Sequence, residues 1–385
     1  MGREESVRSL LRGEPPPKDD GRNVDARLGT LEGDGALQQV EELDSGRPYA
    51  AVPARSDSSF DGQTYYGLPV LKEHVWKAAI PAYFYVGGLA GASSVLGAAA
   101  QWSGNPFLSG LVERTRLIAA GGAVVSAALL IEDLGRPSRF LNMLRVLRPS
   151  SPMSVGSWVL AGFGGFATLA AILRKRRAGP LAAIGDAAAL GAGALGLPLA
   201  GYTGVLLANT AVPVWRGAAT ALPPLFVFSA ATSAACALDL CELNGFERRA
   251  VRRFGIAGKA AELVFSEIVE RQVSEPVVGA PLKRGISGVL WKGAKALVAS
   301  SLALSLLPVA SKRVRRASGW LGTLGTLALR YGIVRAGRIS ARDPRATFGQ
   351  QRARIPTPPD GEADEAAPDL GTPAARADHR SVDVR

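Results

Sequence analysis

The chain has 385 residues, a formal net charge of +12 and 47% hydrophobic residues, but only two histidines and two cysteines. Two cysteines, Cys236 and Cys241, cannot supply the usual four thiolates of an iron-sulfur cluster. His74 and His379 lie outside the apolar part of the sequence, so no pair of histidines is placed to hold a haem inside it. The composition therefore argues against a redox metal bound by this chain.

The two ends of the chain differ from its middle. Residues 1–64 combine charged residues, glycine and proline with few large apolar side chains, and cannot bury enough surface to offset the entropy of ordering. They are predicted to form a disordered polar tail. No basic start followed by a short apolar core and a small-residue cleavage site is present, so we expect no cleaved signal peptide. Residues 341–385 are predicted to form a second flexible tail.

Residues 65–340 are predicted to form a bundle of transmembrane helices. About 20 mainly apolar residues are needed to cross roughly 30 Å of hydrocarbon, and the runs 78–100, 153–173 and 217–238 contain no charged residue. We therefore predict an all-α integral membrane protein with eight crossings. The expected helices are 78–101, 112–133, 153–174, 181–209, 217–240, 256–273, 285–310 and 318–336.

The segment 256–273 leaves an alternative open. It holds Glu262, Glu267, Glu270 and Arg271 at helical spacing. Such a segment is either a crossing buried among its neighbours or a helix that lies at the membrane surface. The second interpretation reduces the number of crossings to seven.

Three basic clusters indicate the orientation. With eight crossings they fall on one side of the membrane, and the positive-inside rule makes that side cytoplasmic. We thus expect a multi-pass protein of the inner (cytoplasmic) membrane with both termini on the outer face, and the net charge requires no nucleic-acid partner. The preference is modest, because the opposite loops also carry arginines. The clusters are Arg174 to Arg177; Arg248, Arg249, Arg252 and Arg253; and Lys312, Arg313, Arg315 and Arg316.

The opposite face collects aromatic, carboxylate and hydroxyl groups from four consecutive helices. Tyr83 lies near the start of the first, Asp133 and Arg136 at the end of the second, Ser157 at the start of the third, and Tyr202 near the end of the fourth. An amphipathic ligand with polar oxygens and an apolar tail would suit this region. An ion pair that closes a helix end explains Asp133 and Arg136 equally well, and an interfacial aromatic belt explains Tyr83 better than a ligand contact.

Four segments carry a resemblance to a known family. They are GLPVLKEHVWKAAIPAYFYVGGLAGASSVLGAAA, IEDLGRPSRFLNMLRVLRPSSPMSVGSW, YTGVLLANTAVPVW and LRYGIVRAGRISARDP. Together they closely resemble the NrfD, or polysulfide-reductase, type of membrane subunit over about residues 65–348. The DLGRP and SPMSVGSW elements are specific, and they stand in the right order at helix ends.

The resemblance implies an eight-helix subunit that binds menaquinone or ubiquinone, as quinone or quinol, in its first four helices. It implies no haem and no iron-sulfur cluster in this chain. Electrons would pass between the quinone and a ferredoxin-like 4Fe-4S subunit, which serves a molybdopterin catalytic subunit. Proton translocation and anaerobic respiration belong to the same expectation.

The resemblance also assigns residues. Asp133, Gly135, Arg136 and Pro137 match the family signature, Asn142 and Arg145 its continuation, and Tyr202, Thr203 and Gly204 the fourth-helix motif. Tyr83 matches a position that faces the quinone in many relatives. We expect Asp133, Arg136 and Tyr202 to take part in the redox chemistry, and the expected quinone contacts are Tyr83, Asp133, Asn142, Tyr202 and Thr203.

Quinol oxidation separates two protons from two electrons, so the quinone oxygens need hydrogen-bond partners and a proton acceptor. Tyr83 and Tyr202 are candidate partners, and Asp133 is a candidate acceptor. Arg136 would keep Asp133 ionised or contact the partner subunit.

Carboxylates inside the membrane are costly and therefore suggest function. Asp186 lies within the fourth helix near its basic end, and a proton path from that side toward the quinone is expected to use Asp186, Asp239, Glu262 and Glu267. An interfacial pair of Asp186 with Arg174, Lys175 or Arg177 is at least as good an interpretation.

Two other functions stay open. One is an ion- or proton-translocating, transporter-like protein without a redox role, in which the same carboxylates line the path. The other is a structural anchor whose quinone pocket has degenerated.

Overall fold

The computed structural model describes residues 23–25, 30–32, 71, 76–135, 142–176, 178–307 and 311–347. His74, Arg136, Pro137, Arg139, Arg177 and most of both predicted tails lie outside these residues. Within the N-terminal tail, β1 (Asn23–Asp25) and β2 (Thr30–Glu32) form a short antiparallel pair. From residue 71 to 347 the described chain is helical apart from its turns and connections.

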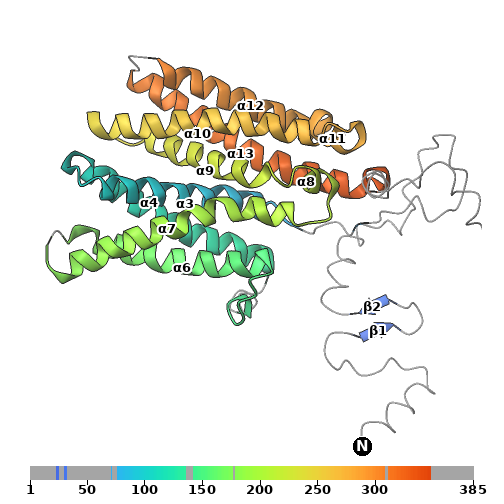
Figure 1. Ribbon diagram of the computed structural model, residues 1–385, viewed down its shortest axis with the longest axis horizontal. Coiled ribbons are helices and arrows are strands. Elements are labelled where there is room, and N and C mark those ends of the chain that lie inside the picture. Colours follow the sequence, from blue (N-terminus) through green and yellow to red (C-terminus); the bar gives the residue numbers. More distant parts are fainter. Residues whose placement is uncertain are drawn as a thin grey trace, which may run out of the picture. The chain divides into compact units, whose positions relative to one another are not determined.

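Long helices follow one another from residue 79 to residue 342 (Figure 1). They are α3 (Ala79–Trp102), α4 (Ser109–Leu134), α6 (Pro152–Ile172), α7 (Pro180–Ala208), α9 (Leu222–Asp239), α10 (Gly245–Gln272), α12 (Gly285–Leu306) and α13 (Lys312–Arg342). Shorter pieces connect them: η2 (Pro106–Leu108), η3 (Leu173–Lys175), α8 (Pro213–Gly217) and α11 (Pro276–Lys283).

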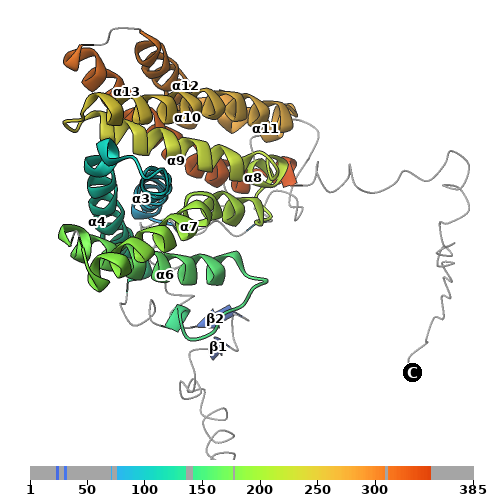
Figure 2. The ribbon, with the colours of Figure 1, turned by 60° about the vertical axis from the view of Figure 1, so that its left-hand side comes forward.

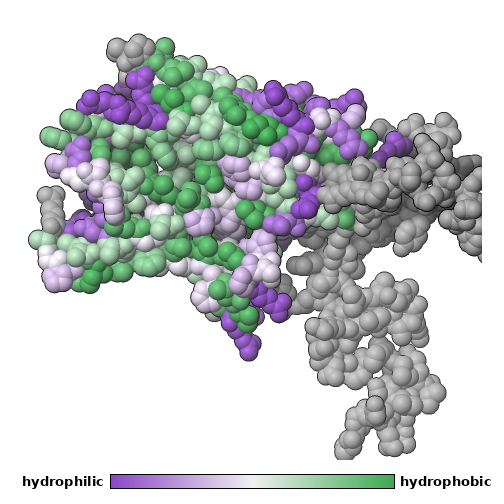
Figure 3. Space-filling model, viewed as in Figure 1, coloured by the Kyte–Doolittle hydropathy of each residue, from purple (hydrophilic) through white to green (hydrophobic). Residues whose placement is uncertain are grey.

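Six of these helices are long and apolar enough to cross a membrane, judged by length and composition alone. They are α3, α4 with η2, α6 with η3, α7, α9 and α12. The prediction of a helical, multi-pass membrane protein is confirmed in this form, whereas α10 and α13 are not among the six. The face in Figure 3 agrees, because hydrophobic residues cover the middle of the helices and hydrophilic residues gather toward their ends.

Helices adjacent in sequence pack against each other as antiparallel pairs: α3 with α4, α6 with α7, α9 with α10, and α12 with α13. Helix α3 also contacts α7, α9 and α13, and Figure 2 shows it enclosed by α4, α7 and α9. Its contact with α7 depends on small residues. A Cβ added at Gly91 would meet the backbone of Gly196 and lie 3.2 Å from Ala200 N. Small residues thus allow α3 and α7 to approach each other closely within the bundle.

Antiparallel pairing gives the bundle two sides. We call the side with the ends of α3, α6, α9 and α12 the basic side, because the described residues of the three basic clusters lie at these ends or at the starts of α10 and α13. Arg114 pairs with Glu247 (3.2 Å), Arg174 with Glu113 (3.5 Å), and Lys312 with Glu242. The Lys312 ammonium lowers the pKa of the Glu242 carboxyl through a hydrogen bond. The other side, with the starts of α3, α6, α9 and α12, is called the pocket side.

Two helices are longer than the hydropathy pattern predicts. Helix α10 begins at Gly245 instead of residue 256, because Asn244 and Glu247 form a capping box in which each side chain accepts a backbone N–H of the other. The arginines that follow lower the hydropathy but are good helix formers. Helix α13 likewise extends beyond 318–336 into basic residues at both ends.

We expect Gly91→Ala to lower the free energy of unfolding by about 1–3 kcal/mol, because the added methyl group overpacks the α3–α7 contact. Thermal unfolding of the detergent-solubilised protein measures the effect. Gly121→Ala on α4 is the matched control, since a Cβ there has no neighbour within 4 Å. Equal effects of the two substitutions would contradict the contact.

Candidate functional site

A pocket of about 630 Å³ lies between the start of α6, the last turns of α7 and the start of α9. Its volume falls in the range of pockets for small organic ligands. Most of the lining is apolar and four of the residues are prolines. The lining residues are Pro149, Ser150, Pro152, Val155, Leu197, Pro198, Gly201, Tyr202, Val205, Asn209, Pro223 and Val227.

The pocket reaches the outer surface of the bundle. Leu197 and Val205 line it and are 55% and 38% exposed. Both lie on α7, one of the six candidate membrane spans, so their exposed surface faces the depth at which lipid would lie. A ligand dissolved in the membrane could enter from the side and leave an apolar tail outside.

Glycines fix the position of Tyr202. Its ring lies against Gly156 of α6, where an added Cβ would be 2.5 Å from the Tyr202 Cδ2 atom. On the other face of α7, a Cβ at Gly204 would be 2.8 Å from the backbone of Leu222 and Pro223. The Gly-Tyr-Thr-Gly sequence therefore brings α6 and α9 close to α7 on either side of the tyrosine, and the predicted Tyr202 is part of the pocket.

The serines of the SPMSVGSW segment hold the pocket wall. Ser151 caps α6 by accepting from Ser154 N (3.4 Å), and the Ser154 hydroxyl accepts from Arg148 N (3.0 Å). Ser157 donates to the carbonyl oxygens of Ser154 (2.8 Å) and Met143 (3.4 Å). The hydroxyls of Ser154 and Ser157 thus hold the loop before α6 against the start of that helix, and Ser157, which the sequence places near a ligand region, is used in this way.

Asp133 closes the end of α4 onto the start of α3. Its Oδ1 accepts a hydrogen bond from Lys77 N at 2.9 Å. Gly135 follows with φ of 72° and ends α4 in the left-handed conformation that favours glycine. The predicted pair of Asp133 with Arg136 lies outside the described residues.

The other expected quinone contacts, Tyr83, Asn142 and Thr203, do not line the pocket. Tyr83 is 3% exposed, and its hydroxyl has no hydrogen-bond partner among the described residues. Its burial excludes the interfacial belt as the explanation for this tyrosine. Thr203 is buried beside Tyr202, and Asn142 is exposed in the loop before α6.

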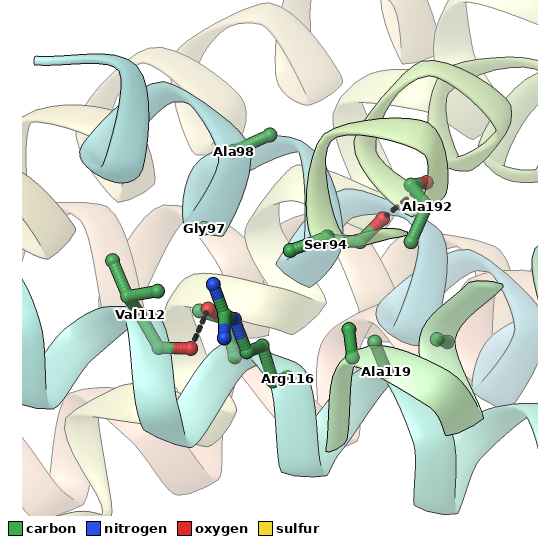
Figure 4. A pocket seen from close by; sticks show the side chains of 11 residues that line it. Ser94, Gly97, Ala98, Val112, Arg116, Ala119 and Ala192 are labelled. Carbon is green, nitrogen blue, oxygen red and sulfur yellow. Dashed lines mark hydrogen bonds between the residues drawn. The ribbon is translucent and has the colours of Figure 1, made fainter. Parts of the chain in front are cut away.

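Asp186 has a partner that the sequence does not indicate. Arg116 Nη2 of α4 lies 2.6 Å from its Oδ1, and Gln101 of α3 bonds both to Arg116 (3.0 Å) and to the Asp186 carbonyl (3.0 Å). A cavity of about 10 Å³ beside Arg116 has room for a water molecule and no more. Figure 4 shows its walls, where Ser94 donates to the carbonyl of Ala192 at 3.1 Å.

The remaining carboxylates of the predicted proton path occupy different environments. Glu267 is exposed and pairs with Lys295 (3.2 Å) and Arg271 (3.5 Å) on the surface of the bundle. Asp239 and Glu262 are buried, at 7% and 1% exposure. The structure thus separates Glu267 and Asp186 from the other two.

Sequence reasoning missed two buried cations near Glu262. Lys259 and Arg330 are each 1% exposed. Two signals could have found them: Lys259 stands three residues before Glu262, hence on the same face of a helix, and Arg330 interrupts an apolar run.

We expect Arg116→Met to lower the free energy of unfolding by about 1.5–3 kcal/mol, because a hydrogen bond to a charged group is lost next to Asp186. Arg271→Met removes an ion pair that is exposed on both partners, and should change the stability by less than about 1 kcal/mol. Thermal unfolding in detergent compares the two. A larger loss in the Arg271 variant would be evidence against the role given to Arg116.

A comparison with protein-family models matches residues 70–254 to the family described as polysulphide reductase, NrfD. The matched part runs from the start of α3 through α9 into α10 and contains the whole pocket. The resemblance to this family is confirmed for these residues. The final segment LRYGIVRAGRISARDP lies beyond the match. No curated protein matches the chain.

Proposed function

Because residues 70–254 belong to the polysulphide reductase NrfD family, we propose that this chain is the quinone- or quinol-interacting membrane subunit of a multi-subunit oxidoreductase. The family consists of membrane subunits of oxidoreductase complexes. In this proposal electrons pass between membrane menaquinone or ubiquinone and a ferredoxin-like 4Fe-4S subunit. That subunit in turn serves a molybdopterin catalytic subunit.

The pocket around Tyr202 is the observation that carries the proposal. Proline and valine side chains provide flat apolar surfaces for a quinone ring, and the exposed Leu197 and Val205 leave a way for the isoprenoid tail into lipid. A few polar groups in an apolar pocket are typical of sites that orient a small ligand. Here these are Ser150, Tyr202 and Asn209.

The Tyr202 phenol is proposed to hydrogen-bond one quinone oxygen. Oxidation of a quinol releases two electrons to the iron-sulfur subunit and two protons to acceptors near the oxygens. Asp133 remains the proposed acceptor or relay, and Arg136, which follows it in the family motif, is proposed to keep it ionised or to contact the partner subunit. Because Asp133, Tyr83, Thr203 and Asn142 do not line the pocket, they act around the quinone in this proposal and not as its direct walls.

We further propose eight crossings, which adds α10 and α13 to the six apolar helices. Both helices turn their central charges inward. On α10 the exposed residues between Arg253 and Glu267 are Ala257, Ala260 and Val264.

On α13, Arg330 is the charged residue between Arg316 and Arg335, and it is buried. These stretches span roughly 21 Å and 28 Å at 1.5 Å per residue. Long arginine stems can extend the shorter one. Eight crossings with the basic side in the cytoplasm would leave both termini outside the inner membrane.

The location of the pocket supports a proposal for the side on which electrons leave. The pocket lies between the C-terminal part of α7 and the starts of α6 and α9, on the pocket side of the bundle. An iron-sulfur subunit that exchanges electrons with this quinone would dock on that side, close to the loop before α6.

The second candidate is an ion- or proton-translocating protein without a redox role. Lys259, Glu262 and Arg330 in the interior favour it, because charges inside membrane bundles often mark ion paths. Bound quinone distinguishes the two functions.

Purification in mild detergent tests the main proposal. We expect the protein to co-purify with extractable quinone and an iron-sulfur subunit, and its own chain to show no haem absorption. Mass spectrometry of the extracted lipids and of the co-purifying chains, with an optical spectrum, measures all three. A folded protein that co-purifies with neither quinone nor partner chains would favour the second candidate function, ion or proton translocation.

We expect Tyr202→Phe to weaken quinone binding by about tenfold, because one hydrogen bond of about 1.4 kcal/mol is lost while the ring still packs on Gly156. Titration of the purified protein with quinone measures the affinity. Tyr331→Phe is the control, since its hydroxyl donates to Ala78 O (2.9 Å) outside the pocket lining. An unchanged affinity in the Tyr202 variant would remove Tyr202 from the site.

A further inference from the structure

The second half of the bundle holds buried charges that the quinone proposal does not use. Lys259 and Glu262 lie on α10 and Arg330 on α13, all beyond the matched residues 70–254, and each is 1% exposed. Asp239, 7% exposed, ends α9. Charged groups of this kind are almost never fully buried unless they are paired or functional.

Glu262 is the least satisfied member of this cluster. The hydroxyls of Ser229 and Thr232 on α9 are beside it, yet neither carboxylate oxygen reaches hydrogen-bond geometry with a described protein group. The Thr232 hydroxyl bonds to Phe228 O of its own helix at 3.1 Å. An ionised carboxylate kept in this state would be costly by several kcal/mol. The geometry therefore favours a carboxyl group that takes up a proton.

Arg330 faces Glu262 from α13. Its Nη2 donates to Phe226 O at 3.0 Å, and its guanidinium carbon lies 3.8 Å from the centre of the Phe226 ring. Nε and Nη1 have no acceptor among the described residues. Tyr85 of α3 lies within the electrostatic range of Arg330. The guanidinium is thus anchored at one edge and open at the other.

Lys259 connects Glu262 to the basic side. Its Nζ donates to Ser305 Oγ (2.7 Å) and lies 3.2 Å from Ser318 Oγ. Ser301 joins this hydroxyl cluster at 3.1 Å from Ser318 Oγ. These serines lie near the end of α12 and the start of α13, which are both on the basic side.

Asp239 completes the connection outward. It lies within the electrostatic range of Lys259 on the inside and of Arg315 toward the surface. Arg315 donates to Cys241 O (3.1 Å) in the turn between α9 and α10. Charged residues thus occur from the basic side to the middle of α10, and Arg315, Asp239, Lys259 and Glu262 interact through their charges and not through hydrogen bonds between these side chains.

We propose that Glu262 is a proton-binding site inside the second half of the bundle, supplied from the basic side through Asp239 and the hydroxyl groups around Lys259. Uptake joins one proton to a carboxylate oxygen, and release returns it to the same path, so no electron or other reactant is involved. The cluster carries two carboxylates and two cations. Each bound proton therefore leaves one excess positive charge in a medium of low dielectric constant, where electrostatic coupling is strong.

The site is independent of the quinone pocket but shares a helix with it. Pro223 and Val227 of α9 line the pocket, while Phe226 and Ser229 of the same helix face Arg330 and Glu262. Residues of the two walls therefore alternate along α9 between Pro223 and Ser229. The proton site does not require that quinone binds.

The test uses dicyclohexylcarbodiimide, an apolar reagent that modifies protonated carboxyl groups, on the full-length protein in mild detergent. We expect modification of Glu262 that decreases as the pH rises, read out by mass spectrometry of its peptide. Glu262→Gln should lose this label. Glu267→Gln, which removes the exposed, ion-paired carboxylate one turn farther along α10, should retain it.

A second variant tests the electrostatic surroundings. The charged and titratable groups facing the site are Asp239 and Cys236 of α9, Lys259 of α10, Arg330 of α13 and Tyr85 of α3. Lys259→Met removes one cation, and labelling of Glu262 should persist to a pH higher by about one unit or more. If this variant does not fold, the pH dependence of labelling in the unmodified sequence still decides.

Two results would overturn the proposal. One is a folded protein whose Glu262 stays unlabelled at every pH from acid to neutral. The other is protection of Glu262 by sodium ions at constant pH, which would make the site a metal-cation site. Neither outcome depends on whether the protein binds quinone.

Discussion

Three polar side chains within the bundle bond to other helices, and these contacts constrain how the helices are placed. Ser94 binds α3 to the backbone of α7, Arg116 binds α4 to Asp186 of α7, and Arg330 binds α13 to the backbone of α9. In hydrocarbon such groups cannot turn to water, so every alternative packing would leave them unsatisfied. The glycines of α3 and α7 allow the close approach that these bonds require.

Helix α9 takes part in both proposed sites. It is short, at 18 residues, and its prolines stand at its start. The first N–H groups of a helix have no acceptor within the helix, so prolines cost no hydrogen bond there. One face of its first turns contributes Pro223 and Val227 to the pocket, and the other face presents the Phe226 carbonyl to Arg330. A shift of α9 would therefore change the lining of the Tyr202 pocket and the contacts of the charge cluster together.

The sequence predicts the helices well and their ends less well. Long apolar runs identify the membrane helices because hydrocarbon admits few charges, whereas the first turns of α10 were missed because four arginines resemble a loop by hydropathy. The partner of Asp186 could not be found by the same reasoning. Arg116 is 70 residues from Asp186 in the chain, and the two side chains meet only in the packed helix bundle.

The candidate site shows the same division. Tyr202 can be identified because it belongs to a short sequence motif. The pocket around it is formed by prolines from α6, α7, α9 and the loop before α6, and no sequence pattern relates these prolines to one another. Lys259 lies in the segment 256–273, for which a helix at the membrane surface is the alternative prediction, and Arg330 lies in the predicted crossing 318–336. In the structure both charges point inward, and they mark the interior of the bundle instead of a surface helix.

The positions of the two sites give the proposals a common consequence. The pocket lies between the C-terminal part of α7 and the starts of α6 and α9. Asp239 and the serines around Lys259 lie toward the opposite, basic side of the bundle. Protons that leave a quinol at Tyr202 would thus be released toward one membrane face, whereas protons that reach Glu262 would come from the opposite face. Because α9 contributes Pro223 and Val227 to the pocket and Ser229 and Thr232 to the surroundings of Glu262, one helix forms part of both sites.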